Sequence, residues 1–317
     1  MPKVSVIIPN YNHARFLPKR IESVLAQTFQ DIEVIFLDDA STDDSLIVFE
    51  RYADDARIRA VFNKVNSGSP FKQWNKGLLE AQGEYIWIAE SDDFADIDFL
   101  GKLCVVLDSN PAVGLVYCQS WLVDNKDKTL YENRRWTDDL SPERWLHSYV
   151  NQGKDEISRF LIYKNTIPNA SAVLFRRDVA LSVTAIDDTL MYCGDWLCWI
   201  NILLCSDIAF VAESLNFWRQ AHTASVRGTI ESARRIREIL YLLRILQQKD
   251  AVHPKRLNKV LRKHYKQWLR SALVNQVSWS THRETVREFS TLYPQIQLID
   301  LAFAPFFLLG SLGRKQT

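Results

Sequence analysis

Apolar and polar positions alternate along the first 118 residues in two repeating patterns. Short apolar runs rich in Val and Ile predict β-strands, and stretches in which apolar residues recur at steps of three and four predict amphipathic helices. Regular alternation of strands and helices indicates βαβ units, so the pattern predicts an α/β fold on a mostly parallel, Rossmann-like sheet with helices on both faces. The predicted strands cover 3–9, 33–37, 58–62, 84–89 and 113–118, and the predicted helices cover 16–29, 42–53, 71–81 and 99–107.

The predicted strand at 84–89 runs directly into acidic residues. Glu90, Asp92 and Asp93 follow it, and Asp38 and Asp39 end the second predicted strand. The carboxyl ends of parallel strands form the edge at which open α/β sheets bind ligands. Carboxylates crowded there repel each other, and a divalent metal, Mn²⁺ or Mg²⁺, that carries a diphosphate would compensate their charge. A solvated acidic loop is the alternative interpretation.

The turn after the first strand excludes two common nucleotide-binding motifs. It reads Pro-Asn-Tyr-Asn at 9–12, where a dinucleotide-binding fold needs GxGxxG, and the P-loop pattern GxxxxGK[ST] does not occur in the sequence. A nucleotide would therefore be held through its base and ribose at the acidic strand ends and through its phosphates by the metal. Ser41 and Asp44 are spaced as in a capping box, which predicts that the next helix begins there.

The second half of the chain is less regular. Beyond a charged turn at 124–128, the sequence up to about residue 165 has no strong period and is interpreted either as a variable loop region near an acceptor or as a plain surface insertion. After Arg227 amphipathic patterns return and predict an all-helical appendage. The apolar tail at 296–312 is interrupted by Asp300 and Pro305, which makes it too broken for a membrane-spanning helix. We expect these C-terminal helices either to contact a membrane surface peripherally or to pack against a second subunit in a homo-oligomer.

Composition and charge describe an ordinary soluble globular protein. The 317 residues are 47% hydrophobic and 24% charged, and the formal net charge is +1, so no nucleic-acid partner is indicated. Five cysteines without a CxxC pair indicate neither a disulfide framework nor a zinc finger. The N-terminus lacks a charged region followed by a long apolar one, so no signal peptide is predicted and a cytoplasmic protein is expected.

Five motifs in the first half carry a resemblance to a known family. They are Val-Ser-Val-Ile-Ile-Pro-Asn-Tyr-Asn at 4–12, Ser-Val-Leu-Ala-Gln-Thr-Phe at 23–29, Asp-Asp-Ala-Ser-Thr-Asp at 38–43, Gly-Glu-Tyr at 83–85 and Ser-Asp-Asp at 91–93. Together they resemble the family-2 glycosyltransferases of the GT-A fold, the group that includes the SpsA-like enzymes. The resemblance implies a nucleotide-diphospho-sugar donor and an inverting transfer.

The resemblance also implies a role for each acidic strand end. Asp39 is expected to hydrogen-bond the nucleotide base, and Pro9 and Tyr11 are expected to line the same pocket. Asp92 matches the residue at the ribose and the metal, and Asp93 matches the metal ligand to the diphosphate. Ser-Asp-Asp stands here in place of a strict Asp-x-Asp, so the number of acids that touch the metal stays open.

Two further residues acquire a role through the resemblance. Asp195 precedes an apolar helical run and is by itself a typical helix N-cap, but an acid at this place in the family is the general base. His222 lies in a closing motif at 217–225, an aromatic residue and Arg followed by His and Ser, and is expected to ligate the metal or contact the diphosphate. A lone histidine is otherwise more often a surface or packing residue. One base and one metal suffice for an inverting transfer without a covalent intermediate.

The sequence therefore predicts a cytoplasmic, metal-dependent, inverting glycosyltransferase. It is expected to move a sugar from a UDP-linked donor to a glycan or lipid-linked acceptor in bacterial surface polysaccharide biosynthesis, and the inner face of the membrane is where a lipid-linked acceptor would meet it. The expected domains are a GT-A catalytic domain at 1–226, with a nucleotide-sugar half at 1–125 and an acceptor half at 126–226, and a helical region at 227–317. The alternatives are a non-catalytic nucleotide-sugar-binding module and a nucleotidyltransferase on a similar sheet, which would need a glycine-rich loop that residues 9–18 lack.

Overall fold

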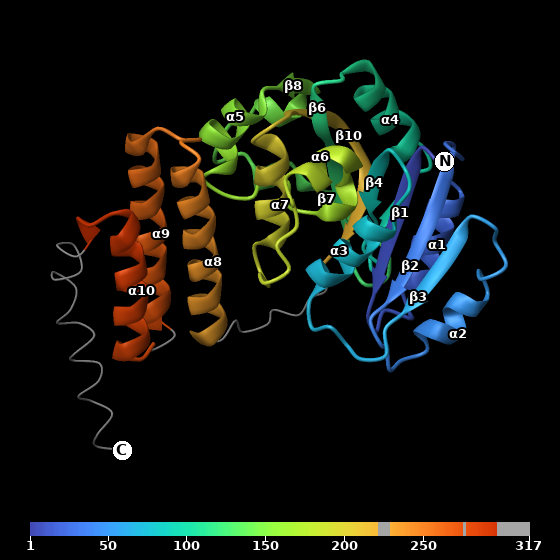
Figure 1. Cartoon of the computed structure of the whole chain (residues 1–317), viewed down its shortest axis with the longest axis horizontal. Coiled ribbons are helices and arrows are strands. Elements are labelled where there is room, and N and C mark those ends of the chain that lie inside the picture. The colour runs from blue at the N-terminus through green and yellow to red at the C-terminus, as the bar shows by residue number, and fades with distance from the viewer. Residues whose placement is uncertain (221–228, 275–276, 297–317) are drawn as a thin grey trace. The chain divides into compact units, whose positions relative to one another are not determined.

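The computed structural model describes residues 1–220, 229–274 and 277–296. The chain divides into two compact units, residues 1–223 and 224–317, and each unit is described by itself. Figure 1 labels most of the helices and strands of both. The domain boundary predicted between residues 226 and 227 falls outside the described residues and stays a prediction.

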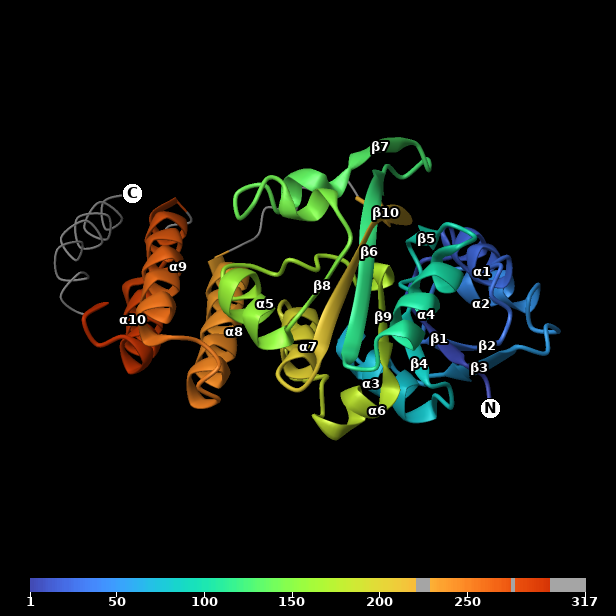
Figure 2. The same cartoon turned by 90° about the horizontal axis from the view of Figure 1, so that it is seen from above.

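A ten-stranded sheet runs through the described part of the N-terminal unit (Figures 1 and 2). Its strands are β1 (Val4–Asn10), β2 (Ile32–Asp38), β3 (Ile58–Phe62), β4 (Tyr85–Ile88), β5 (Phe94–Ala95), β6 (Val113–Val123), β7 (Thr129–Glu132), β8 (Tyr149–Asn151), β9 (Val173–Arg176) and β10 (Asp207–Arg219). Their order is β3-β2-β1-β4-β9-β6-β10-β5, with β7 paired to β6 and β8 paired to β10. Strands β3, β2, β1 and β4 are parallel to one another, β9 is antiparallel to β4 and β6, and β10 is parallel to β6.

Helices cover both faces of this sheet. They are α1 (Leu17–Leu25), α2 (Ser45–Glu50), α3 (Pro70–Glu80), α4 (Phe99–Ser109), α5 (Gly153–Glu156), α6 (Arg177–Ser182) and α7 (Gly194–Leu203), with 3-10 turns η1 (Asn133–Trp136), η2 (Arg144–Leu146) and η4 (Ala170–Ala172) and a π-helical turn η3 (Ile157–Leu161).

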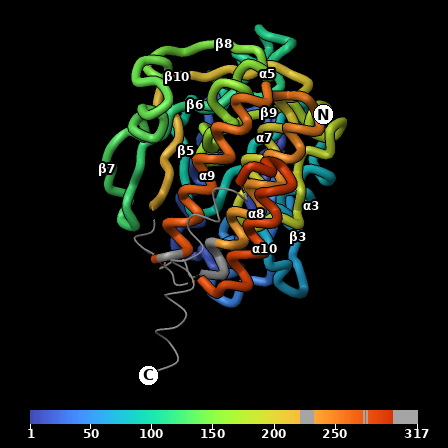
Figure 3. Tube along the Cα trace, turned by 90° about the vertical axis from the view of Figure 1, so that its left-hand side faces the viewer, coloured from blue at the N-terminus to red at the C-terminus, as the bar shows by residue number. Residues whose placement is uncertain are grey.

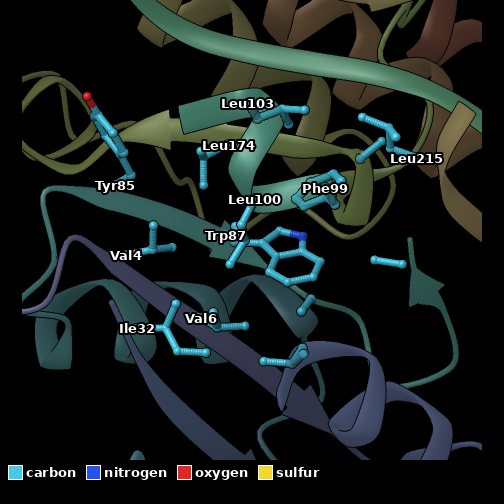
Figure 4. Close-up of a cluster of buried hydrophobic side chains, with 14 of the residues drawn as sticks. Val4, Val6, Ile32, Tyr85, Trp87, Phe99, Leu100, Leu103, Leu174 and Leu215 are labelled. Carbon is cyan, nitrogen blue, oxygen red and sulfur yellow. The ribbon is translucent and has the colours of Figure 1, made fainter. Parts of the chain in front are cut away.

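On one face, Val4 and Val6 of β1 share a buried cluster with residues of α1, α2 and α4 (Figure 4). On the other face, α3 packs on β1, and Trp74 of α3 lies beside Trp199 of α7 with ring centroids 6.1 Å apart. Burial on both faces explains why β1 is apolar along most of its length.

The elements predicted between residues 3 and 118 are confirmed in type and order. The third strand has the predicted bounds, and the first helix is shorter than predicted. The short antiparallel strand β5, which directly follows Asp93, was not predicted from the sequence pattern.

Three helices form the described part of the C-terminal unit (Figure 3). They are α8 (Thr229–Gln248), α9 (Pro254–Val274) and α10 (Trp279–Leu292), and each packs against the other two. Their core includes Leu243 of α8 and Leu261 of α9, and the rings of Tyr265 and Phe289 meet with centroids 5.2 Å apart. None of the described helices combines the length and the apolar character that crossing a bilayer requires. The predicted tail helix at 296–312 lies almost entirely outside the described residues.

Candidate active site

Parallel pairing brings most of the predicted site residues to one edge of the sheet. Strands β2, β1 and β4 are direct parallel neighbours, so the residues after their carboxyl ends lie side by side. Pro9 is buried within β1, and Tyr11, 45% exposed, follows that strand. Asp39 follows β2, and Asp92 and Asp93 lie between β4 and β5. The geometry fits the predicted pocket, and the role of each residue stays a prediction.

The carboxylate of Asp39 is buried and fully engaged by protein donors. Its oxygens accept hydrogen bonds from Asn63 Nδ2 (2.6 Å), from Gln73 Nε2 (2.8 Å), and from the Ser67 backbone N–H (2.9 Å) and hydroxyl (2.7 Å). A carboxylate offers about four acceptor positions, so these donors fill its capacity. A nucleotide base that binds Asp39 must therefore share or displace one of them, and Ser67 belongs to the loop before α3.

The predicted capping box at Ser41 is wrong. Helix α2 begins at Ser45, and Asp44 occupies its N-cap position. The Ser41 hydroxyl and backbone N–H donate instead to the Asp38 carboxylate, at 2.6 and 2.9 Å. Between these residues Ala40 has φ of +60°, a left-handed conformation that costs energy for a residue other than glycine. The turn after β2 is thus shaped by Asp38, which leaves Asp39 as the residue that faces Ser67 and Gln73.

Three carboxyl groups after β4 have raised pKa values. Burial and then the charge of Asp92 raise the pKa of Asp93 to about 6, and the same two causes raise the pKa of Glu90 to about 8. Burial likewise raises the pKa of Asp92, which is half-buried. Asp93 is 2% exposed and accepts hydrogen bonds from Asn169 Nδ2 and from the backbone N–H of Arg219, both at 2.8 Å. Such a cluster favours a bound cation, because each carboxylate is costly to ionise alone.

Two buried arginines partly balance these acids. Arg20 is fully buried, and its Nε donates to the backbone carbonyl of Glu90 at 2.8 Å. Its two terminal nitrogens have no hydrogen-bond partner among the described residues, and burial lowers its pKa to about 10. Arg219 donates to the Asp92 carbonyl at 2.6 Å and forms an ion pair with Asp127 at 2.5 Å. Sequence reasoning missed Arg20, although a cation among the apolar positions of α1 is a recognisable signal.

The acids at this edge fit a divalent metal held jointly with a diphosphate. No group of three or more potential protein ligands lies together in the described part of the chain. Mg²⁺ and similar cations bound with substrate phosphates use one or two carboxylates and complete their shell with phosphate oxygens and water. Asp92 and Asp93 provide that number. The third predicted ligand, His222, lies outside the described residues.

Asp195 lies in the first turn of α7, and the N-cap interpretation is wrong. Cys193 occupies the N-cap position, and Gly194 is the first helical residue. A Cβ on Gly194 would lie 2.6 Å from the Phe71 ring, so only glycine lets α7 begin this close to α3. Asp195 is half-buried and accepts hydrogen bonds from the Trp196 backbone N–H (2.7 Å) and from Asn165 Nδ2 (2.8 Å).

A five-residue segment connects Asp195 with the acidic cluster. Asn165, at its start, donates to Asp195, and Asn169, at its end, donates to Asp93. Residues 165–169 thereby hold a separate carboxylate at a fixed place relative to the acids after β4. Sequence reasoning missed both asparagines, because the contact depends on the tertiary fold. The arrangement places a buried acidic cluster and a separate carboxylate at the two ends of one short segment.

Comparisons with known proteins agree with this geometry. The family model described as Glycosyl transferase family 2 matches residues 5–182. An uncharacterized glycosyltransferase of Nostoc sp. is 31% identical over 225 residues, which cover 68% of this chain and 64% of that relative. The match therefore spans less than two thirds of the relative's length.

Solved structures share the fold at low sequence identity. The crystal structure of Staphylococcus aureus TarS 1–349 in complex with UDP-GlcNAc matches with a TM-score of 0.68 at 17% identity, covering 93% of this chain and 81% of that one. The mannosyltransferase PcManGT from Pyrobaculum calidifontis, in complex with GDP-Man and Mn²⁺, matches with a TM-score of 0.59 at 16% identity, covering 98% of this chain and 84% of that one. These likenesses confirm the predicted GT-A fold.

Proposed function

Because this chain belongs to glycosyl transferase family 2, we propose that it is a metal-dependent, inverting glycosyltransferase with a nucleotide-diphospho-sugar donor. The observation that carries the proposal is the segment at 165–169, which ties Asp195 to the acidic cluster at Asp93. A glycosyl transfer needs those two functions close together: a place for the departing diphosphate and a base for the attacking hydroxyl.

The donor lies along the carboxyl ends of β1, β2 and β4. Asp39, Pro9 and Tyr11 hold the nucleotide base, and Asp92 faces the ribose. Asp92 and Asp93 would hold a divalent metal, which would supply positive charge to the diphosphate. Arg20, buried beside the same acids, adds a fixed positive charge to the site.

Asp195 acts on the acceptor. Its carboxylate takes the proton from the acceptor hydroxyl as that oxygen forms a bond to the anomeric carbon. The bond between the anomeric carbon and the diphosphate oxygen breaks, and the nucleoside diphosphate leaves with the electron pair. A single displacement inverts the configuration at the anomeric carbon, so no second nucleophilic carboxylate is required.

The donor is a UDP-sugar in this proposal, and the acceptor is a glycan or a lipid-linked saccharide. The solved relative with UDP-GlcNAc supports a UDP donor, and the relative with GDP-Man and Mn²⁺ supports a divalent metal. We place the enzyme in the cytoplasm, at the inner face of the membrane, in bacterial surface polysaccharide assembly. A catalytic domain at 1–226 and a helical region at 227–317 remain the proposed organisation.

A panel of nucleotide sugars tests the proposal. UDP-GlcNAc, UDP-glucose, UDP-galactose and GDP-mannose are incubated with the protein and Mn²⁺, Mg²⁺ or EDTA, and nucleoside diphosphate release is measured. We expect release from one donor, dependent on metal. Asp195→Asn should bind that donor as tightly as the wild type and release little diphosphate. Binding without turnover in the wild type would favour the alternative of a non-catalytic nucleotide-sugar-binding module.

A further inference from the structure

We propose that Asn165 is a positioning residue for Asp195, which orients the carboxylate toward the acceptor and keeps it ionised. The inference rests on the proposed function, in which Asp195 is the general base. It goes beyond that function because it assigns a role to a residue outside the family motifs quoted above, on a segment that the sequence left as an irregular region.

Hydrogen bonds at both its nitrogen and its oxygen hold the side-chain amide of Asn165 in one orientation. Its Nδ2 donates to Asp195 Oδ2 at 2.8 Å, and its Oδ1 accepts the backbone N–H of Ile167 at 3.2 Å. A flip of the amide would place its oxygen against the carboxylate and its NH₂ group against the Ile167 N–H, so both contacts would be lost. The amide can therefore present only its donor to Asp195.

This donor acts on one of the two carboxylate oxygens. The Trp196 backbone N–H holds Oδ1, and Asn165 holds Oδ2. A hydrogen bond to the charged form lowers a carboxyl pKa, and a neutral amide does so without adding a charge. Burial and then the charge of Asp195 raise the pKa of the Cys198 thiol, one turn further along α7.

The backbone of Asn165 is held by a tryptophan. Its carbonyl accepts the Nε1–H of Trp136 at 2.7 Å. All ten tryptophans lie in the described ranges, and Trp136 in η1 is the one that is more than a third exposed, at 38%. Lys164, next to Asn165, lies over the same ring, 5.0 Å from its centroid. Two hydrogen bonds thus connect the segment from 129 to 146 with the proposed general base: Trp136 donates to Asn165, and Asn165 donates to Asp195.

The first experiment measures kinetics of Asn165→Ala on the donor that the wild type turns over fastest in the panel, with water as the acceptor. We expect kcat to fall about 10- to 100-fold, the size of effect that a misplaced catalytic group causes, with the donor KM unchanged within about twofold. The acidic limb of the kcat–pH profile should move to higher pH. Trp136→Phe keeps an aromatic ring but loses the N–H donor. It should move the acidic limb of the profile in the same direction by a smaller amount.

Asn201→Ala is the matched control. Asn201 also lies on α7 and donates through its amide to a backbone carbonyl, that of Ala185, at 3.2 Å. Its loss removes one amide hydrogen bond near the same helix without touching Asp195. We expect its pH profile to match that of the wild type. An Asn165→Ala profile that also matches the wild type would overturn the proposal.

A second experiment needs no substrate. The protein is labelled with ¹³Cγ-aspartate, the Asp195 signal is identified by its loss in Asp195→Asn, and its pKa is measured by NMR titration. Asn165→Ala should raise that pKa, and Asn165→Asp should raise it further, because a second negative charge opposes ionisation. An unchanged pKa refutes the positioning role. Full turnover by Asp195→Asn would instead refute the base assignment in the proposed function, so the two failures are distinguishable.

Discussion

Asp39 accepts hydrogen bonds from four protein donor groups. Asp39→Ala should therefore have two effects. It should weaken UDP binding by about 1–3 kcal/mol, the range for a lost buried polar partner, and it should lower the melting temperature because Ser67 and Gln73 lose their acceptor. Isothermal titration calorimetry with UDP and thermal unfolding measure the two separately.

Ser67→Ala is the control for this prediction. It removes the hydroxyl that would compete with the nucleotide base for a hydrogen bond to Asp39, and it leaves the Asp39 carboxylate in place. We expect it to bind UDP at least as tightly as the wild type. If Asp39→Ala and the wild type bind UDP equally, Asp39 does not recognise the base, and its role is to anchor the loop before α3.

Asp93 should couple metal binding to pH. Its pKa of about 6 lies above the ordinary value for an aspartate, so protons compete with a cation as the pH falls through about 6. Mn²⁺-dependent donor binding should be strong at pH 7.5 and weak at pH 5.5, as measured by calorimetry. Two variants, Asp93→Asn and Asp93→Ala, should lose the metal-dependent part of donor binding at either pH. The first of them retains the shape of the side chain.

Asp108→Asn serves as the matched control for Asp93. Asp108 is an acid at the far end of α4, where it pairs with Lys3 at 2.8 Å, and its loss should leave metal-dependent binding unchanged. Donor affinity that is the same with and without Mn²⁺ in the wild type, or a fully metal-responsive Asp93→Asn, would contradict the assignment of Asp93 as a metal ligand.

Single residues also show where sequence reasoning was right for an incomplete reason. Gly83 was noted as the first residue of the Gly-Glu-Tyr motif, and α3 ends just before it, at Glu80. The structure adds a steric cause, because a Cβ on Gly83 would lie 2.5 Å from the backbone nitrogen of Ser5. Arg20 was not identified at all. Its function depends on acids seventy residues away in sequence, a proximity that no local pattern contains.

At the scale of elements, the first 118 residues were predictable because local periodicity and burial agree there. The parallel strands β1, β2 and β4 are mostly apolar runs and were found where expected. The start of α2 was missed because the hydroxyl of Ser41 serves the turn at Asp38 instead of the helix. The 13-residue strand β10 pairs with β6, β5 and β8, and such non-local pairing leaves a weak local signal.

Helix α9 contains a histidine that should make the C-terminal unit sensitive to acid. His264 is 5% exposed, and burial, followed by the charge of Lys263, lowers its pKa to about 4 from the ordinary 6.5. The unfolded chain binds a proton more readily than the folded one between these values, so stability is complete above pH 6.5 and falls as the pH drops toward 4. The free energy of unfolding should fall by about 3 kcal/mol in this range.

His264→Leu should remove this pH dependence. The replacement keeps an apolar group in a buried place and has nothing to protonate. Hydrogen exchange of α9 amides at pH 4.5, 5.5 and 7 reports the local stability. His253→Gln, at an exposed position before α9, is the control and should behave as the wild type. Equal pH slopes for His264→Leu and the wild type would show that another group controls acid unfolding.

At the scale of the whole molecule, a net charge of +1 conceals a strongly basic surface. One side of α9 lines a groove of about 710 Å³. Its lining consists of six cations and two amides and includes no acid among the described residues: Lys255, Asn258, Lys259, Arg262, Lys263, Lys266, Gln267 and Arg270. The spacing of these residues in the sequence indicates a basic cluster, because residues at steps of three and four share a helix face. It could not indicate that this face lies open along a groove.

The final prediction is that the C-terminal helices bring the enzyme to an anionic membrane surface. Anionic headgroups attract a basic residue near the surface by roughly 1 kcal/mol, and the sequence at 296–312 adds apolar residues rich in Phe and Leu, followed by Arg314 and Lys315.

Full-length protein should co-sediment with phosphatidylglycerol vesicles at low salt and remain in the supernatant with phosphatidylcholine. Lys259→Glu combined with Lys266→Glu should weaken sedimentation, and so should truncation after Tyr293, because each removes one of the two attractions. If all forms stay in the supernatant with anionic vesicles, the membrane contact is refuted. If truncation instead changes the mass measured by light scattering, the tail is an interface between copies of the chain.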